Sequence, residues 1–311
     1  AHADVGEDAD NTTIRIGVPM PTIPSDRIEF SAIVDRPPMK FDGDSRLVVW
    51  PILNLEVWEI VRPMARQVLP APTGVVVQPD IPNWSWHEYG MRVGYWRLKE
   101  MFDRMAITPT LSINAAVCER YERVAASARD ADWEFMGHSY VQMPTQALDD
   151  EEANIARSLE ICERFTGKRP LGWLGPGLTE TYDTPDLLTK HGVKYIGDFV
   201  FDDEPCTMTT DSGPLVALPY AVELNDIPTM IIQHHESSYF KTKILDQFQQ
   251  LYAESAERSK FLAFAIHPYL SGVPHRIRYL VEALEHMAAQ PGVEFWTGEQ
   301  IYRWYAGRTG L

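Results

Sequence analysis

From about residue 46 to the C-terminus, short apolar runs alternate with longer amphipathic segments. The run Arg46-Leu-Val-Val-Trp-Pro-Ile-Leu-Asn-Leu-Glu56 is almost continuously apolar, which is typical of a strand buried on both faces. Similar runs predict further strands at 108–113, 133–138, 171–174, 194–199, 215–218, 229–233, 261–266 and 293–296. Helices are predicted at 92–105, 115–129, 149–165, 184–191, 243–259, 275–289 and 298–306. The alternation favours an α/β fold, either a parallel sheet or a β/α barrel, in one domain that spans 46–311.

Two segments interrupt this alternation. Residues 1–45 are acidic, polar and rich in proline, so we expect an N-terminal arm or irregular lead-in. Residues 62–90 are rich in Pro, Gly and Trp, and they predict a long loop. Long loops in compact domains usually serve function, which makes this segment a candidate wall of a binding site.

The overall charge and the cysteines exclude several classes of protein. The chain has 28 Lys and Arg against 44 Asp and Glu, a net charge of −16, so neither nucleic acid nor an anionic membrane is an expected partner. Three widely spaced cysteines, Cys118, Cys162 and Cys206, do not predict a disulfide framework. Residues 1–10 lack the basic start and apolar core of a signal peptide, so we expect a cytoplasmic protein.

Polar residues stand where several predicted strands end. Asn54 and Glu56 close the first strand, His138 follows 133–138, Gly175-Pro-Gly177 follows 171–174, and His267 follows 261–266. In β/α folds the reactive groups lie at these strand ends, so these residues are expected to line one mouth. Gln142 stands four residues after His138, where a second histidine would have suggested a metal pair.

Several motifs carry a resemblance to one family. They are Asn54-Leu-Glu56, Glu88-Tyr-Gly-Met-Arg92-Val-Gly94, Gly137-His138-Ser, Tyr195-Ile-Gly-Asp198 through Asp202-Asp-Glu-Pro205, Leu218-Pro-Tyr220 with Asn225-Asp226, and His267 through Arg276. In this order and over this length, the chain resembles the polysaccharide deacetylase (NodB-type) superfamily. It is most similar to the intracellular branch of metal-independent allantoinases, cyclic imide hydrolases and peptidoglycan-deacetylase-like proteins. The resemblance implies a distorted (β/α) barrel of the deacetylase type and a homo-oligomer, a dimer or tetramer.

The sequence departs from the metal-dependent members of this family at their ligands. Those members hold a divalent ion with one Asp and two His spaced His-x-x-x-His, and the matching positions here are Asn54, His138 and Gln142. The family's third-motif arginine is also absent, since the matching segment reads Trp173-Leu-Gly-Pro-Gly. Neutral amides are poor ligands for transition metals, so we predict that no metal is required. A weak divalent site, for example for zinc, at Asn54, Glu56 and His138 remains the alternative.

The favoured function is metal-independent hydrolysis of a non-peptide C–N bond in a cyclic amide, imide or ureide. Glu56 is the expected base that activates water, and His267 is the expected acid for the leaving nitrogen. His138, with the amides of Asn54 and Gln142, is expected to orient the carbonyl of a small-molecule substrate. Other candidate substrate-binding residues are Trp86, Tyr89, Arg92, Trp173, Pro176, Tyr220 and Asp202.

Two other functions stay open at this point. One is a metal-dependent N-deacetylase of a sugar or peptidoglycan-like substrate. The other is a non-hydrolytic binding or isomerase-like protein that keeps the pocket. The candidate residues also have structural alternatives: Glu56 as the partner of Arg92, His138 as a buried core histidine, and Asp202 in an ordinary turn.

Overall fold

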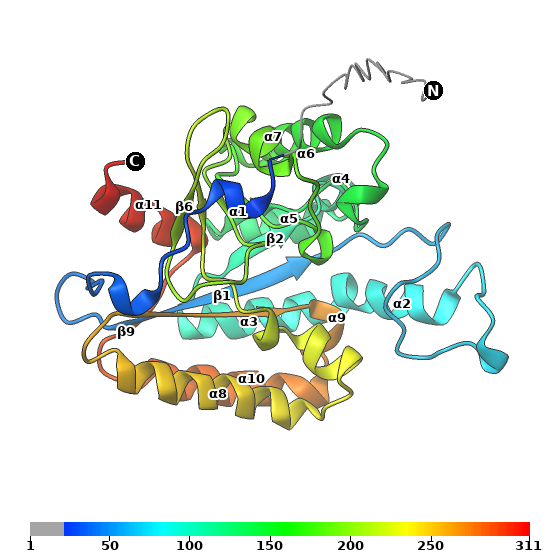
Figure 1. Cartoon of the computed structure of the whole chain (residues 1–311). Coiled ribbons are helices and arrows are strands. Elements are labelled where there is room, and N and C mark those ends of the chain that lie inside the picture. Colours follow the sequence, from blue (N-terminus) through cyan, green and yellow to red (C-terminus); the bar gives the residue numbers. More distant parts are fainter. Residues whose placement is uncertain (1–21) are drawn as a thin grey trace, which may run out of the picture.

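The computed structural model describes residues 22–311, and the expectations for residues 1–21 lie outside the described part. One curled sheet forms its centre, with the order β6-β7-β5-β4-β3-β2-β1-β8 and with β9 also paired to β1 (Figure 1). All pairs are parallel except β6 with β7. The predicted α/β fold, a distorted (β/α) barrel, is confirmed. The strands are β1 (Leu47–Leu55), β2 (Thr110–Ile113), β3 (Glu134–Gly137), β4 (Gly172–Trp173), β5 (Tyr195–Ile196), β6 (Cys206–Met208), β7 (Leu215–Ala217), β8 (Lys260–Ile266) and β9 (Val293–Phe295).

Helices surround this sheet, and α8 and α10 lie side by side along one side of it (Figure 1). The helices are α1 (Pro24–Arg27), α2 (Ile81–Tyr89), α3 (Tyr95–Met105), α4 (Ala116–Arg120), α5 (Glu122–Arg129), α6 (Glu151–Thr166), α7 (Thr184–Lys190), α8 (Ser237–Glu254), α9 (Pro268–Ser271), α10 (Pro274–Ala288) and α11 (Gly298–Thr309). Among the helices of residues 22–311, none is both long and apolar enough to cross a membrane.

Two sequence-based predictions of secondary structure were wrong, and one strand was missed. The expected long loop contains α2, and Asp80 caps its N-terminus: the Asp80 side chain accepts a hydrogen bond from the Asn83 backbone N–H. The strand expected at 229–233 is a π-helical turn, Ile227–Ile232, whose Pro228 fits a helical first turn. A short apolar run does not distinguish a strand from a buried helical turn. The sequence also gave no sign of β6.

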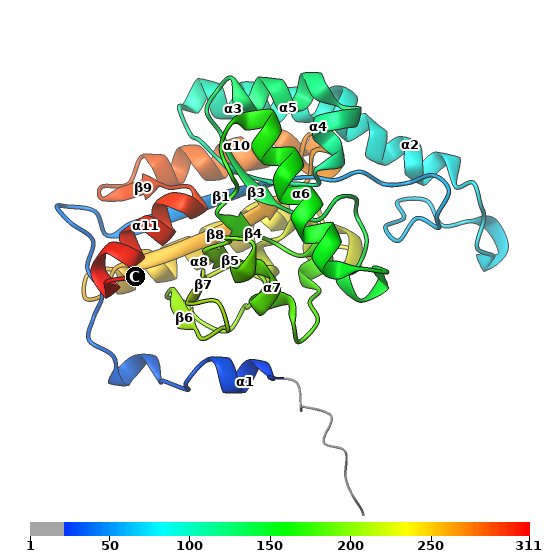
Figure 2. The same cartoon turned by 90° about the horizontal axis from the view of Figure 1, so that it is seen from above.

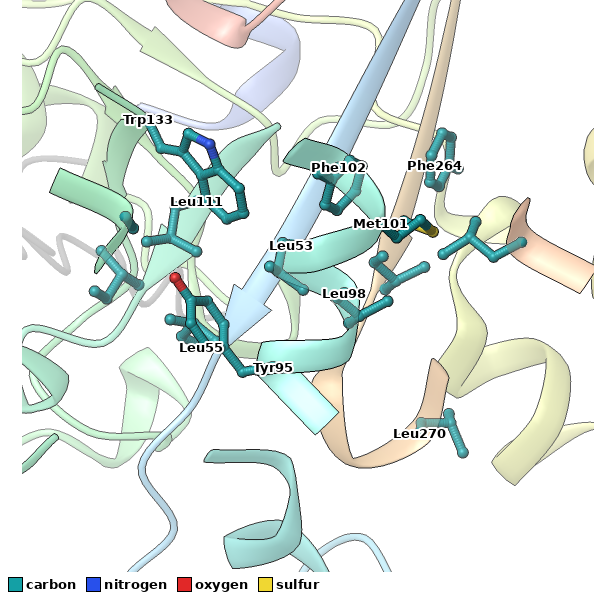
Figure 3. Close-up of a cluster of buried hydrophobic side chains, with 14 of the residues drawn as sticks. Leu53, Leu55, Tyr95, Leu98, Met101, Phe102, Leu111, Trp133, Phe264 and Leu270 are labelled. Carbon is teal, nitrogen blue, oxygen red and sulfur yellow. The ribbon is translucent and has the colours of Figure 1, made fainter. Parts of the chain in front are cut away.

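The two faces of β1 pack against different parts of the molecule. Leu47, Val49, Leu53 and Leu55 face outward, where Figure 3 shows Leu53 near Leu98 and Leu55 near Tyr95 of α3. The alternate residues Val48, Trp50 and Ile52 pack inside the barrel with residues from β7 and β8. Side chains alternate along a strand, so the even-numbered positions that follow, Asn54 and Glu56, continue the inner face.

The same alternation directs two histidines inward. Met136 of β3 packs in the inner cluster, and His138 lies two residues further along. On β8 the inner cluster contains Ala263 and Ala265, and His267 continues that series. The carboxyl ends of β1, β3 and β8 thus bring polar side chains into the same end of the barrel.

The N-terminal segment 22–45 packs along the outside of the barrel, next to β6 (Figure 2). It contains α1, and the buried guanidinium of Arg27 pairs with Asp186 at 2.5 Å. A second pair joins Arg36 to Asp202 at 2.6 Å. These ion pairs attach a segment that we expected to be irregular.

A close backbone contact sets the position of α9. The π-helical turn Gly90–Gly94 joins α2 to α3 and crosses α9, where a Cβ at Gly94 would overlap the carbonyl oxygen of Pro268. A Cβ at Gly90 would come within 2.8 Å of the Tyr269 backbone nitrogen. Glycine at both positions therefore allows α9 to sit directly against this turn, with His267 and Tyr269 at its start.

Replacing Gly94 by Ala should lower the free energy of unfolding by about 3 kcal/mol, because the added methyl group forces these two backbones apart. The matched control is Gly307→Ala in α11, where a Cβ meets nothing within 4 Å and helix propensity favours Ala by about 1 kcal/mol. Urea denaturation of both variants measures the difference. Wild-type stability in Gly94→Ala would contradict the close packing.

Candidate active site

A cavity of about 200 Å³ opens at the carboxyl ends of β1, β3 and β8. Six of the residues predicted from the sequence line it: Asn54, Glu56, His138, Gln142, Tyr220 and His267. The rest of its lining is Trp58, Arg66, Leu174, Gly175, Gly177, Leu178, Val222, Asn225, Ile227, Pro228, Ile232 and Tyr269. The strand ends therefore meet in one place, as the strand alternation predicted.

Glu56 is the buried acid of this cavity, with 9% of its surface exposed. Its Oε2 accepts hydrogen bonds from Trp58 Nε1 and from the Tyr269 hydroxyl, both at 3.0 Å. Its Oε1 accepts one from Gln142 Nε2 at 2.8 Å. A buried carboxylate without donors would be costly, and these groups compensate it. Oε1 still has acceptor capacity on its remaining side.

The two donors on Oε2 are held in place by His87. Its ring lies 4.6 Å from that of Trp58 and 4.4 Å from that of Tyr269, measured between centroids. Burial lowers the pKa of His87 to about 4, so the ring is neutral near pH 7. His87 thus packs as an uncharged aromatic group behind the donors of Glu56.

His267 lies between two carboxylates. Its Nδ1 donates to Asp226 Oδ1 at 2.6 Å, and its Nε2 lies 3.3 Å from Glu56 Oε1. Asp226 is fully buried, and its Oδ2 accepts from the His267 backbone N–H at 2.8 Å and from the Ser271 hydroxyl at 2.6 Å. Asp226, His267 and Glu56 therefore form one line of alternating charge.

The charges of Asp226 and Glu56 shift the pKa of His267, and the charge of His267 shifts the pKa of Glu56. Burial favours neutral imidazole, but the carboxylates of Glu56 and Asp226 outweigh it and raise the pKa of His267 to about 10. Burial likewise raises the pKa of the Glu56 carboxyl, but the charge on His267 and the imidazole of His138 hold that pKa well below its usual range. Near neutral pH, His267 is a cation and Glu56 an anion.

His138 presents an open nitrogen to the same space. Its Nδ1 donates to the carbonyl oxygen of Leu174, which leaves Nε2 as the acceptor of the neutral ring. Nε2 is buried, has no hydrogen-bond partner among the described residues, and lies 3.8 Å from Glu56 Oε1. A buried polar atom of this kind is usually satisfied, so its natural partner is a bound molecule.

The two amides that replace metal ligands have different partners. Gln142 donates to Glu56, and its Oε1 accepts from Asn114 Nδ2 at 3.3 Å. Asn54 donates to the carbonyl oxygen of Ile266 at 3.3 Å. Asn114, fully buried, also donates to the His138 carbonyl oxygen and accepts from the Val57 backbone N–H at 2.8 Å. Asn114 therefore fixes the ends of β1 and β3 relative to each other.

The donor set does not fit a divalent metal ion. Gln142 turns its NH₂ group, a donor, toward Glu56, and two of the three expected ligand positions are neutral amides. Hydrogen-bond donors already occupy both oxygens of Glu56. Within residues 22–311, no three His, Cys, Asp or Glu side chains are grouped so that they could hold a metal.

The remaining predicted substrate-binding residues lie outside the cavity. Arg92 is exposed, so it is the partner of neither Glu56 nor a substrate in the cavity. Asp202 binds Arg36 of the N-terminal segment. Tyr89 accepts a hydrogen bond from Arg97, and Trp86 packs against Tyr269.

The other two predicted substrate-binding residues, Trp173 and Pro176, lie beside the wall of the cavity. Trp173 is buried against Gly137, and Pro176 is buried between the lining residues Gly175 and Gly177. The wall itself is fixed by Asp198, whose carboxylate accepts the Gly175 backbone N–H at 2.8 Å. Burial raises the pKa of Asp198 to about 6. Pro176 thus shapes the wall, and Trp173 packs in the core.

Four residues of the candidate site were not predicted from the sequence: Asp226, Tyr269, Trp58 and Arg66. Asp226 and Tyr269 stood inside recognised motifs, so a buried acid next to the histidine of the last motif could have been anticipated. Trp58 follows Glu56 by two residues on the same strand extension, a spacing that also gives a signal. Arg66 gave no signal, because it lies in an irregular segment.

This arrangement contains the parts of an acid–base hydrolytic site. A cationic imidazole can donate a proton, while a carboxylate and an open imidazole nitrogen can accept one. All three face the same small cavity.

No family model matches the sequence. A Schizosaccharomyces pombe protein named as a polysaccharide deacetylase is 24% identical over 257 residues, which is 75% of this chain and 78% of the relative. A polysaccharide deacetylase structure from Pseudomonas aeruginosa PAO1 superposes with a TM-score of 0.80 at 26% identity, covering 89% of this chain and 96% of the other. The structure of Puue allantoinase superposes with a TM-score of 0.81 at 25% identity, covering 95% and 100%.

These likenesses extend over most of each chain and concern sequence as well as fold. They confirm the family that the motifs indicated, with an allantoinase among its structural neighbours. The barrel is accordingly of the deacetylase type, and the chain is similar in sequence and fold to proteins of the polysaccharide deacetylase superfamily.

Proposed function

We propose that the protein hydrolyses a C–N bond in a small cyclic amide, imide or ureide and that it does so without a metal. Deacetylases and allantoinases both cleave C–N bonds other than peptide bonds, which supports a hydrolase of this class. The observation that carries the proposal is the buried line Asp226–His267–Glu56 at the cavity. The cavity of about 200 Å³ is smaller than the roughly 300–1,000 Å³ typical of sites for drug-sized ligands, which favours a compact ring as substrate.

His267 is the proposed acid. It is protonated near neutral pH: burial alone would lower its pKa, but the carboxylates of Glu56 and Asp226 more than offset burial and raise that pKa to about 10. Its Nε2–H faces the cavity and Glu56, so it can stabilise the oxyanion and then protonate the leaving nitrogen. Asp226 positions the ring from the other side.

Glu56 and His138 are the proposed acceptors of the water proton. A water bonded to both Glu56 Oε1 and His138 Nε2, 3.8 Å apart, would donate one hydrogen to each. The lowered pKa makes Glu56 a weak base on its own. His138 Nε2, which has no hydrogen-bond partner among the described residues, provides a second acceptor beside it.

The choice of a cyclic substrate follows from the missing Lewis acid. Imide and ureide carbonyls are more electrophilic than the carbonyl of an acetamide, so hydrogen-bond donors and one imidazolium are sufficient to activate them. The side-chain amides of Asn54 and Gln142 each donate one N–H to a protein group, and the second N–H of each amide can donate to a bound carbonyl.

A second candidate is the N-deacetylation of a sugar. The names of the Schizosaccharomyces pombe relative and the Pseudomonas aeruginosa structure favour it. A panel of hydantoin, succinimide, dihydrouracil, allantoin and N-acetylglucosamine oligomers separates the two candidates. Release of acetate from the oligomers alone would support the deacetylase.

Glu56→Gln should lower turnover of the cyclic substrates by roughly 10²–10⁴-fold, because the amide cannot accept a proton from water. Product formation measured by chromatography gives the rate, and circular dichroism checks folding. Glu59→Gln is the matched control, since Glu59 pairs with Arg62 and Arg120 outside the cavity. Wild-type turnover in Glu56→Gln would exclude this mechanism.

Asp226→Asn should lower the pKa of His267 by roughly one to three pH units, because a neutral amide no longer stabilises the imidazolium. The protonated ring is the active form, so the alkaline limb of kcat/KM should move to lower pH by the same amount. NMR titration of the ring should give a midpoint near pH 10 in the wild type.

Asp42→Asn serves as the control for Asp226→Asn, since Asp42 is exposed and pairs with Arg308. It should leave the titration of His267 unchanged. A wild-type midpoint near 6.5, or no change in Asp226→Asn, would contradict the assigned charge line.

A further inference from the structure

Arg66 lines the cavity from the irregular segment between β1 and α2. Its side chain is partly exposed, whereas Glu56, His138 and His267 are buried. The arginine therefore lies toward the mouth, and the acid–base groups lie at the floor.

The backbone on both sides of Arg66 is anchored. Met64, two residues before it, is 4% exposed. Two residues after it, the Val68 backbone N–H donates to Asn83 Oδ1 of α2 at 2.9 Å, and Leu69 N–H donates to the same oxygen at 3.1 Å. Asn83 also donates to the Leu69 carbonyl oxygen at 2.8 Å. The segment thus holds Arg66 at the cavity on a fixed stretch of backbone.

No ion pair or hydrogen bond joins the Arg66 guanidinium to a group within residues 22–311. Arg62, on the same segment, instead pairs with Glu59 at 3.2 Å. An arginine presents five donors in a planar fork that matches a carboxylate. Arg66 therefore has its whole fork available to a molecule in the cavity.

The charges on the cavity wall support an anionic ligand. The lining among the described residues carries two cations, Arg66 and His267, and one anion, Glu56. His267 lies between Asp226 and Glu56, whereas no carboxylate among the described residues pairs with Arg66, so Arg66 is the cation of the lining that is left for an anionic ligand. Glu56 is itself covered by its donors Trp58, Tyr269 and Gln142, which shield it from a second anion.

We propose that Arg66 binds a carboxylate on the substrate, so that the substrates are anionic cyclic amides or ureides. The ring carbonyl lies at the floor beside Glu56 and His267, and the carboxylate points toward the mouth. This inference rests on the proposed function for the position of the ring. Its test is a binding measurement, which does not require turnover.

The experiment compares matched rings by isothermal titration calorimetry. Dihydroorotate and dihydrouracil differ by one carboxylate, as do hydantoin-5-acetate and hydantoin. The wild type should bind the carboxylate-bearing member about tenfold or more tightly than its neutral partner, as a charge-assisted contact provides. Arg66→Met should remove this preference while leaving affinity for the neutral rings within about twofold, and Arg66→Lys should keep part of it.

Arg62→Met is the control, because Arg62 lies on the same segment, is exposed and does not line the cavity. It should keep the wild-type preference. The inference is overturned if the wild type shows no preference, if it binds neither carboxylate-bearing ring at millimolar concentration, or if Arg66→Met retains the preference. Hydrolysis of the rings by a wild type that shows no preference for the carboxylate would preserve the proposed function but overturn the inference, whereas Arg66-dependent selective binding without hydrolysis would do the reverse.

Discussion

The buried carboxylate of Glu56 is the constraint on which this site depends. An ionised acid inside a barrel is stable only with donors and a nearby cation. Those groups come from separate parts of the chain: Trp58 beyond β1, Gln142 beyond β3, and His267 and Tyr269 beyond β8. The segments that carry these residues converge on the Glu56 carboxylate, which their donors and the His267 cation stabilise. The glycines of the turn Gly90–Gly94 allow α9 to pack directly against that turn, which places Tyr269 near Glu56.

This constraint also gives a physical reason for the amide at position 142. A histidine there would bring a third imidazole to a carboxylate that already faces two. Glutamine supplies a neutral donor and is itself held by Asn114. The site therefore balances its charge among Asp226, His267 and Glu56, where its metal-dependent relatives are expected to use an ion. That difference supports metal-free chemistry as our proposal.

The sequence predicted the strand-bound part of the site well. Alternation along β1, β3 and β8 placed Asn54, Glu56, His138 and His267 inside, because side-chain direction in a strand follows from position alone. The sequence-based prediction failed where the direction of a side chain depends on packing with residues far along the chain. Asp202 pairs with Arg36, 166 residues away, and Arg92 is exposed to solvent. Asp226 precedes the π-helical turn Ile227–Ile232, which the apolar run 229–233 led us to predict as a strand. The position of Arg66 depends on the hydrogen bonds that Asn83 makes to the backbone of the same segment.

The central claim is that hydrogen bonds and one imidazolium replace the metal of the family. Its most direct test is turnover of the cyclic substrates by protein stripped with a chelator, with bound metal measured in the same sample by mass spectrometry. Our account predicts that hydrolysis persists at full rate when metal is far below stoichiometric and that added zinc does not increase it. Loss of activity on stripping, with recovery at stoichiometric zinc, would contradict the account.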